Sequence, residues 1–352
     1  MKRLILFIIA GILAGIGVSL VYDFYLSPDR LYFLKAAELS DAWAEKLRAE
    51  SDEPCYVLAG GSEVRMCIDP GIIHKEHGVR LITAGGMAGF GLTCNVTHAF
   101  KYLKPGDTLI VSCRHFVFPE NDITTSGLKF CWATMGTNMF RHGLIPFNLT
   151  HLSHIFRPNS DELSMYLTKR ILKPDELFKY NSKTVQHPSG WCENFHIEKN
   201  LLMQYAVYTT NISRSFIIQQ RAAQFFDKLN QICHKKNIRL LVFQNIEYSH
   251  STTDRDIVTS ALALTREGIS VIKLDSLSNE RDIQYMADRP NHLNSKGAQK
   301  YSNELGVALK NNRVWTEKEL LQTLYKLGFD AQGNMRYSHK MWRYLYMENE
   351  WR

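Results

Sequence analysis

The chain begins with a long uncharged hydrophobic run, followed by a second helical pattern. Residues Leu4 to Tyr22 carry no charged side chain, and this run of about 19 residues is close to the ~20 that cross a bilayer as a helix. From Arg30 to Glu50 the apolar residues recur near helical spacing. We therefore predict a membrane-spanning helix and then a linker helix, which serves either as a stalk or as a helix packed on the rest of the protein.

Beyond residue 54, short apolar runs alternate with amphipathic segments. The apolar runs predict buried strands at 55–59, 79–83, 108–112, 238–243 and 269–274. The segments between and after them predict helices at 64–75, 91–103, 215–235, 253–267 and 298–309. Strands that alternate with helices predict an α/β fold with a mainly parallel central sheet.

The alternation stops between about residues 115 and 213, a stretch that contains several prolines and aromatic residues. It is too long for a simple loop, so we interpret it as an insertion with partial structure of its own. The predicted organisation has four parts: a cytoplasmic tip and transmembrane anchor over 1–23, the linker helix over 24–53, one α/β domain over 54–312 and a C-terminal helical tail over 313–352.

The charges beside the hydrophobic run predict its orientation. Lys2 and Arg3 precede the run, whereas Asp23 and Asp29 follow it. The cationic flank of a membrane helix stays in the cytoplasm, so the main domain is expected in the periplasm or outside the cell. The alternative is a cleaved signal peptide, but its apolar region is usually only about 7–15 residues long and ends at a small-residue cleavage site. Gly17-Val-Ser-Leu-Val is a poor site of that kind, which favours a retained single-pass anchor.

A candidate nucleophile follows the first predicted strand. Cys55 to Ala59 is apolar, and Gly60-Gly61 comes directly before Ser62. Two glycines allow a sharp backbone turn, which would place Ser62 at the carboxyl edge of the sheet, where open α/β sheets bind ligands. The simpler alternative is an ordinary Gly-Gly-Ser turn.

A candidate base lies near the end of the domain. His292 precedes Leu293-Asn294-Ser295, which predicts a turn into the last helix of the domain, and Asp288 stands four positions earlier. A serine hydroxyl becomes nucleophilic when an imidazole accepts its proton, and an acid fixes the tautomer of that imidazole. Ser62, His292 and Asp288 are therefore the candidate catalytic residues.

These two blocks resemble those of the SGNH (GDSL-like) hydrolase superfamily. Gly60-Gly61-Ser62 matches its first block, Glu63 to Pro70 is similar to the membrane-anchored branch that acylates polysaccharides, and His292-Leu-Asn matches its last block. Asp288 and His292 are separated by three residues, where the superfamily usually has two. The resemblance covers about residues 54–310 and implies a three-layer sandwich around the central sheet, with no cofactor.

The resemblance also implies further site residues. Its second block supplies an oxyanion-hole N–H, for which Gly86 or Gly85 is the candidate beside the N–H of Ser62. A glycine-rich turn is the alternative explanation of this pair. The third block should bring an asparagine after the strand at 108–112, but the chain has Arg114 and His115 nearby. Arg114 or His115 is the candidate to replace its donor and contact substrate. The alternatives are that Asn121 or Asn138 reaches in from the loop, or that the third donor is missing.

One more polar group follows a predicted strand. Asn245 lies just after the strand at 238–243, so its side chain is a candidate for contact with a ligand at the carboxyl edge of the sheet. Ordinary turn chemistry is the alternative, because asparagine is common where strands end.

Composition limits the other classes of function. The seven cysteines form no Cys-x-x-Cys pair and have no zinc-type spacing with histidine, so no metal site is expected. Cys55 and Cys113 fall in predicted buried strands, and one or two disulfides among the others are compatible with an exported protein. The net charge of +7 is scattered along the chain, which disfavours nucleic acid as a partner.

The resemblance implies transfer or removal of a small acyl group, typically acetyl, on a cell-surface or exported polysaccharide through an acyl-Ser62 intermediate. It also implies a multi-spanning membrane acyltransferase as a partner at the inner membrane. The residues do not separate O-acyltransferase from esterase. One alternative is a non-catalytic glycan-binding or scaffolding subunit, and another is an anchored glycosyltransferase. Asp254-Arg-Asp256 falls at a predicted helix start, where it is better explained as capping than as a metal–nucleotide motif.

Overall fold

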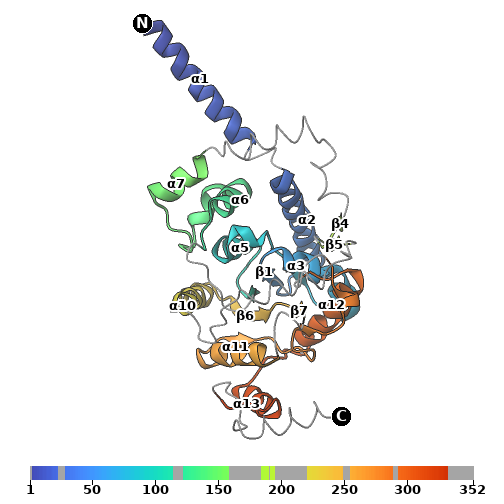
Figure 1. Ribbon diagram of the computed structural model, residues 1–352. Helices are drawn as coiled ribbons and strands as arrows, with labels where there is room; N and C mark the ends of the chain where they lie inside the picture. Colours follow the sequence, from blue (N-terminus) through green and yellow to red (C-terminus); the bar gives the residue numbers. More distant parts are fainter. Residues whose placement is uncertain are drawn as a thin grey trace, which may run out of the picture.

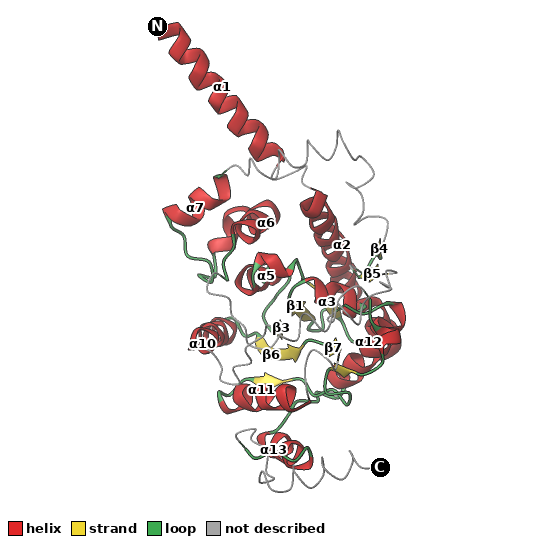
Figure 2. Ribbon diagram, in the orientation of Figure 1, coloured by secondary structure: helices red, strands yellow, loops and turns green. Residues whose placement is uncertain are grey.

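The computed structural model of the protein describes residues 2–22, 28–113, 122–157, 184–189, 191–194, 220–248, 254–287 and 292–331. Its centre is a five-stranded sheet in the order β2-β1-β3-β6-β8, and every neighbouring pair is parallel (Figures 1 and 2). These strands are β1 (Tyr56–Ala59), β2 (Leu81–Thr83), β3 (Thr108–Cys113), β6 (Arg239–Gln244) and β8 (Ser270–Val271). The α/β class and the parallel sheet predicted from the sequence are confirmed.

Helices cover both faces of the sheet, which explains why its strands are apolar throughout. Consecutive residues of a strand point to opposite faces, and Leu109, Ile110 and Val111 of β3 are all fully buried. One face packs against α2 (Pro28–Glu50), α5 (Leu92–Ala99), α10 (Gln220–Lys235), α11 (Asp254–Arg266) and α13 (Glu317–Lys326). The other packs against α3 (Ser62–Cys67), α4 (Pro70–His77) and α12 (Ser295–Lys310).

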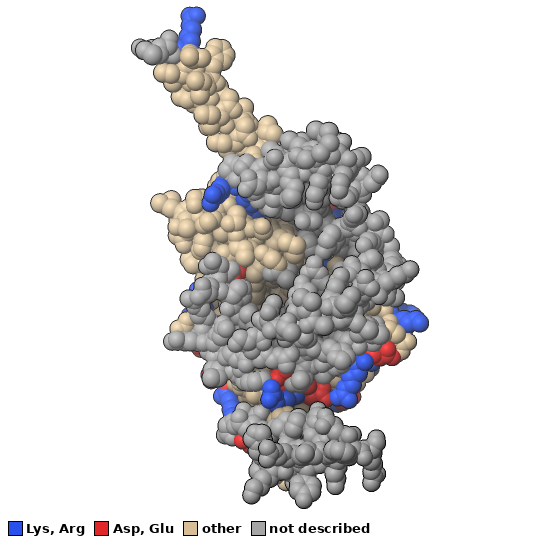
Figure 3. All heavy atoms as spheres, in the orientation of Figure 1, with Lys and Arg blue, Asp and Glu red and all other residues tan. Residues whose placement is uncertain are grey.

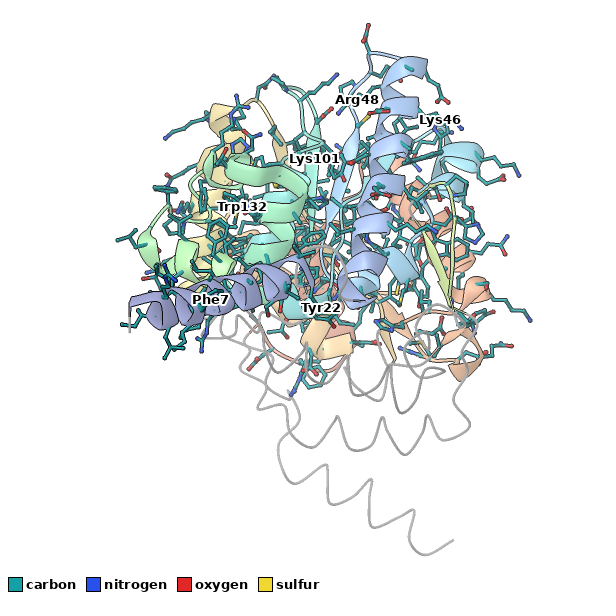
Figure 4. The ribbon with its side chains drawn as sticks, turned by 90° about the horizontal axis from the view of Figure 1, so that it is seen from above. Phe7, Tyr22, Lys46, Arg48, Lys101 and Trp132 are labelled. Atoms are coloured by element: carbon teal, nitrogen blue, oxygen red, sulfur yellow. The ribbon has the colours of Figure 1, made fainter. Side chains whose placement is uncertain are left out.

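The linker helix α2 closes the β2 edge of the sheet. The indole N–H of Trp43 donates to the Leu81 carbonyl at 2.9 Å, and the Ser40 hydroxyl donates to the Thr83 carbonyl at 2.8 Å. Both carbonyls belong to the outermost strand, which would otherwise present free polar groups. Arg48 also pairs with the buried Asp107, and Figure 4 shows Arg48 on α2 next to the sheet. Of the two alternatives, α2 is therefore a packed helix and not a stalk.

The helix predicted at 64–75 is two helices instead of one. It breaks at Asp69, because Pro70 lacks an N–H and disfavours helical geometry in the residue before it. Proline is favoured as the first residue of a helix, and Asp69 caps α4 by accepting the Gly71 N–H at 2.8 Å. The first of the two helices, α3, therefore ends at Cys67.

The stretch at 115–213 is described only in part. Residues 122–157 form α6 (Thr125–Met135), η3 (Gly136–Phe140) and α7 (Leu149–Phe156). These elements share a buried cluster that includes Leu128, Phe130 and Ile155, and η2 (Ala88–Phe90) joins it through Phe90. A short antiparallel pair, β4 (Thr184–Gln186) with β5 (Cys192–Asn194), follows. The same cluster includes Ala37 of α2, Met66 of α3 and Cys94 of α5, so the described part of this stretch packs on the domain through a small shared core.

The N-terminal helix α1 (Lys2–Val21) projects from the domain (Figure 1). Its segment Arg3–Val21 is 19 residues long, has a mean hydropathy of 2.8 and is 6% buried. These properties fit a single membrane anchor, and a signal sequence near an N-terminus would share them. The side of the membrane on which the domain lies stays a prediction.

The described cysteines outside β3 and β5 are not joined in disulfides, and all of them are buried: Cys55, Cys67, Cys94, Cys131 and Cys233. Burial raises the pKa of the Cys55 thiol and raises that of Cys233 to about 12. Cys55 fills the buried position expected of a small apolar residue.

The remaining described elements lie after β6. They are β7 (Glu247–Tyr248), which pairs in parallel with β9 (Asn279–Glu280), and η5 (Ile283–Tyr285). The tail begins with α13, whose Thr316 and Glu319 form a capping box. The tail beyond residue 331 lies outside the described residues.

Candidate active site

Ser62 lies at the turn between β1 and α3. The strand ends at Ala59, Gly60 and Gly61 form the turn, and Ser62 is the first residue of the helix. A side chain at Gly60 has no room, because its Cβ would lie 2.5 Å from Val64 Cγ2 and 2.8 Å from Ser112 Cβ. The glycine therefore allows the turn to lie directly against α3 and β3, with Ser62 at the carboxyl end of β1.

The neighbouring Glu63 holds this turn from within. Its Oε1 accepts the N–H of Gly61 at 2.7 Å, and the residue is 8% exposed. An acidic side chain in the first turn of a helix is also favoured by the partial positive charge there. The sequence pattern does not predict this role, although a carboxylate one position after the candidate serine is a signal for it.

Arg65 connects α3 to two other parts of the fold. The residue is 1% exposed, and its Nε donates to the carbonyl of Gly85, in the loop after β2. Its Nη1 donates to the Ala36 carbonyl at 3.0 Å and to the Ser40 hydroxyl at 3.1 Å, both on α2. The helix that begins with Ser62 is thus fixed to α2, a contact that the sequence pattern does not predict.

His292 is positioned by the start of α12. Its carbonyl accepts the Ala287 N–H at 2.8 Å, and Met286 and Leu293 form a β-bridge. Asn294 caps α12 through Gly297 N–H at 3.1 Å and donates from Nδ2 to the Met286 carbonyl at 3.1 Å. The two ends of the loop that carries His292 are therefore joined and tied to a rigid helix.

The structure brings Ser62 and His292 together. Ser62 Oγ lies 3.1 Å from His292 Nε2, although 230 positions separate the two residues in the sequence. Both are buried, with exposures of 9% for Ser62 and 2% for His292. A hydroxyl at this distance from an imidazole nitrogen is in reach for direct proton transfer. This contact is the geometry that a serine nucleophile and its general base require.

Three predicted site residues cannot be compared with this geometry. Asp288, the candidate acid, and Arg114 and His115, the candidate substrate contacts, lie outside the described residues. Their roles stay predictions.

The glycines proposed for the oxyanion hole occupy the loop after β2. The N–H of Gly86 donates to the Gly60 carbonyl at 3.0 Å and so extends the ladder between β1 and β2. The carbonyl of Gly85 receives Arg65. In this conformation Gly86 supports the turn before Ser62, and it would have to release Gly60 before its N–H could bind an oxyanion.

Asn245 reaches the same edge of the sheet from β6. Its Oδ1 accepts the hydroxyl of Ser112, near the end of β3, and the residue is 6% exposed. Ser112 also lies against Gly60, since its Cβ is 2.8 Å from the position that a Cβ at Gly60 would take. The carboxyl ends of β1, β3 and β6 therefore place a serine, a second hydroxyl and an amide in one neighbourhood.

Within the described ranges, no group of three or more His, Cys, Asp or Glu side chains is arranged to hold a metal ion. Asp254 and Asp256 lie in the first turn of α11, where they pair with Arg281 and Arg255. Comparisons with known protein families and with curated proteins find no match to this chain.

Proposed function

We propose that the protein is a membrane-anchored enzyme of SGNH type that transfers or removes a small acyl group on a cell-surface or exported polysaccharide. The 3.1 Å contact between Ser62 Oγ and His292 Nε2 is the observation that carries this proposal. The five-stranded parallel sheet, with Ser62 at the carboxyl end of β1, supports it as a fold. O-acetylation is preferred over hydrolysis on the resemblance to the anchored branch alone.

The proposed reaction has two halves. In the first, Ser62 Oγ bonds to the acyl carbon of the donor while His292 Nε2 takes the hydroxyl proton, and the proton then passes to the departing group. In the second, His292 takes a proton from a sugar hydroxyl or from water, whose oxygen attacks the acyl carbon. The bond to Ser62 breaks, and its oxygen regains a proton from His292. Asp288 is the proposed acid that orients the imidazole.

The charge on the tetrahedral intermediate needs hydrogen-bond donors. The N–H of Ser62 is a candidate, because the first N–H groups of a helix have no carbonyl partner within the helix. Gly86 or Gly85 is proposed as the second donor. Gly86 would contribute only after it moves away from Gly60, with which it is bonded at 3.0 Å.

A substrate-independent probe tests the central claim. An alkyl fluorophosphonate should form a covalent adduct on Ser62, identified by peptide mass spectrometry. The adduct should be absent in Ser62→Ala and strongly reduced in His292→Ala. Ser51→Ala and His77→Ala are matched controls, since Ser51 lies after α2 and the partly buried His77 bonds Asn303. Unfolding curves of all four variants establish that each is folded.

Turnover of 4-nitrophenyl acetate and acylation of the glycan then measure catalysis. Ser62→Ala and His292→Ala should each lower turnover by about 10³-fold or more, because residues that act as one unit fail together. Asp288→Asn should cost less if another group also orients His292. Wild-type acylation by a folded Ser62→Ala protein would exclude the covalent mechanism.

A non-catalytic glycan-binding subunit is the second candidate function. The bond from Gly86 N–H to Gly60 favours it, because that donor is occupied in this conformation. Under this alternative, the wild-type protein would form no phosphonate adduct. The Ser62→Ala substitution would leave the acylation of the glycan unchanged.

A further inference from the structure

Exposed apolar side chains lie on α7 and two residues before it. Phe147, Leu149 and Phe156 are 70%, 85% and 44% exposed. Ile155 of the same helix is fully buried in the cluster beneath. We refer to Phe147, Leu149 and Phe156 as the α7 face. Large apolar groups that gather in one place on a surface usually mark a contact with another apolar phase.

The membrane helix ends next to this face. Leu20, in the last turn of α1, packs against the buried cluster that contains Ile155. Ser19 and Tyr22 are each only 4% exposed, so the end of α1 is held by the domain. Figure 1 shows α7 at the end of the domain from which α1 projects. The α7 face is therefore on the side of the domain from which α1 would enter a bilayer.

The charge of this region fits an anionic lipid surface. Residues 123–157 contain no Asp or Glu, and their charged residues are Lys129, Arg141 and Arg157. Both arginines are exposed, and they flank the α7 face in the sequence. In Figure 3 the described surface around α7 is mostly uncharged, with basic groups beside it. Apolar side chains with arginines beside them are typical of helices that lie in a membrane interface.

We propose that the α7 face lies in the interface of the same bilayer that α1 enters. Phe147, Leu149 and Phe156 would reach the boundary between headgroups and acyl chains, about 5–10 Å deep. Arg141 and Arg157 would meet lipid phosphates. This inference goes beyond the proposed function and does not depend on Ser62. It gives the domain a second point of attachment, so that α7 and α1 together fix its orientation.

A labelled full-length protein tests the proposal. Leu149→Cys carries an environment-sensitive nitrobenzoxadiazole label, and the protein is reconstituted in nanodiscs of phosphatidylglycerol and phosphatidylcholine. Tyr325→Cys is the matched control, because Tyr325 is 62% exposed on α13, at the far end of the domain (Figure 2). The protein without an introduced cysteine, treated with the same label, measures the background from native thiols, five of which are buried. Intact mass verifies that α1 is retained.

Lipids with a spin label near the headgroup should quench most of the emission at position 149 and little of that at 325. Replacing phosphatidylglycerol by phosphatidylcholine should weaken the quenching at 149, and Arg157→Gln should do the same in the anionic discs. Equal, weak quenching at the two positions would overturn the proposal. A blue-shifted emission at 149 that lipid spin labels do not quench would also overturn it, and would assign the face to a protein partner or a second copy of this chain.

Discussion

At the scale of single residues, the space around Gly60 controls where Ser62 lies. We expect Gly60→Ala to destabilise the protein by about 1–3 kcal/mol, as overpacking in a filled core does. The added Cβ would meet Val64 at 2.5 Å and Ser112 at 2.8 Å. Phosphonate labelling of Ser62 should fall as well. Urea unfolding in detergent measures the loss.

Gly89→Ala is the control for this substitution, because its Cβ would approach only the flexible end of Met87, at 3.2 Å. Equal stability of the two variants would contradict the prediction, because it would show that the turn has room for a side chain at Gly60.

A second residue-scale prediction concerns the buried His98. Burial, with Arg65 and Lys101 nearby, lowers the pKa of His98 from 6.5 to about 3. Between these two values the unfolded chain binds a proton that the native state does not. The free energy of unfolding should therefore fall as pH falls from about 6.5 to 3, with a slope contribution of up to about 1.4 kcal/mol per pH unit. In His98→Gln this part of the slope should be absent.

The comparison uses slopes, not absolute stabilities, so a uniform destabilisation of His98→Gln does not disturb it. His77→Gln is the control, since His77 is only partly buried. Equal slopes for wild type and His98→Gln over this pH range would contradict the assignment.

At the scale of elements, α2 protects the edge strand β2. Trp43→Phe keeps an aromatic ring, smaller than the indole, but leaves the Leu81 carbonyl without its 2.9 Å partner. We expect a loss of about 1–3 kcal/mol, the usual cost of a buried polar group without a hydrogen bond. Glu45→Gln, on the exposed side of the same helix, should change little. Urea unfolding measures the free energy of unfolding of both variants. Equal losses would contradict a specific role of the Trp43 hydrogen bond in covering the edge strand.

The elements also show what local sequence patterns can predict. Strands β1, β3 and β6 were found within a residue or two, because their apolar runs are fully buried and bounded by turns. The break at Asp69-Pro70 was missed even though the proline was visible, because the apolar spacing continued across it. The proximity of Ser62 and His292 could be predicted because Ser62 follows the end of β1 and His292 precedes α12. A parallel sheet brings both positions to its carboxyl edge.

The buried charges could not be predicted in this way. Glu63 and Arg65 look like solvent-facing residues of a short helix, and yet both are buried. Their partners are the Gly61 N–H and the carbonyls of Gly85 and Ala36. Such partners become available only when the β1 turn, the loop after β2 and α2 meet, which local periodicity does not encode.

At the scale of the whole molecule, the charges around α1 predict its topology. Lys2 and Arg3 should remain in the cytoplasm, so protease added to intact spheroplasts should digest the chain beyond about residue 23. Immunoblotting of the fragments measures this, with a known periplasmic protein as the control. Protection of the domain while that control is cut would reverse the orientation and remove the exported glycan as substrate.

The cover of β2 by α2 also determines where this chain can be shortened. A start between residues 23 and 27 would remove α1 and keep the edge strand closed. A start at Tyr56 would leave the carbonyls of Leu81 and Thr83 without Trp43 and Ser40, and an open edge strand is a template for pairing with another molecule. We expect the longer soluble form to be monomeric in size-exclusion chromatography and the shorter one to aggregate. The segment that follows α1 in the sequence is thus expected to protect the folded domain from self-association.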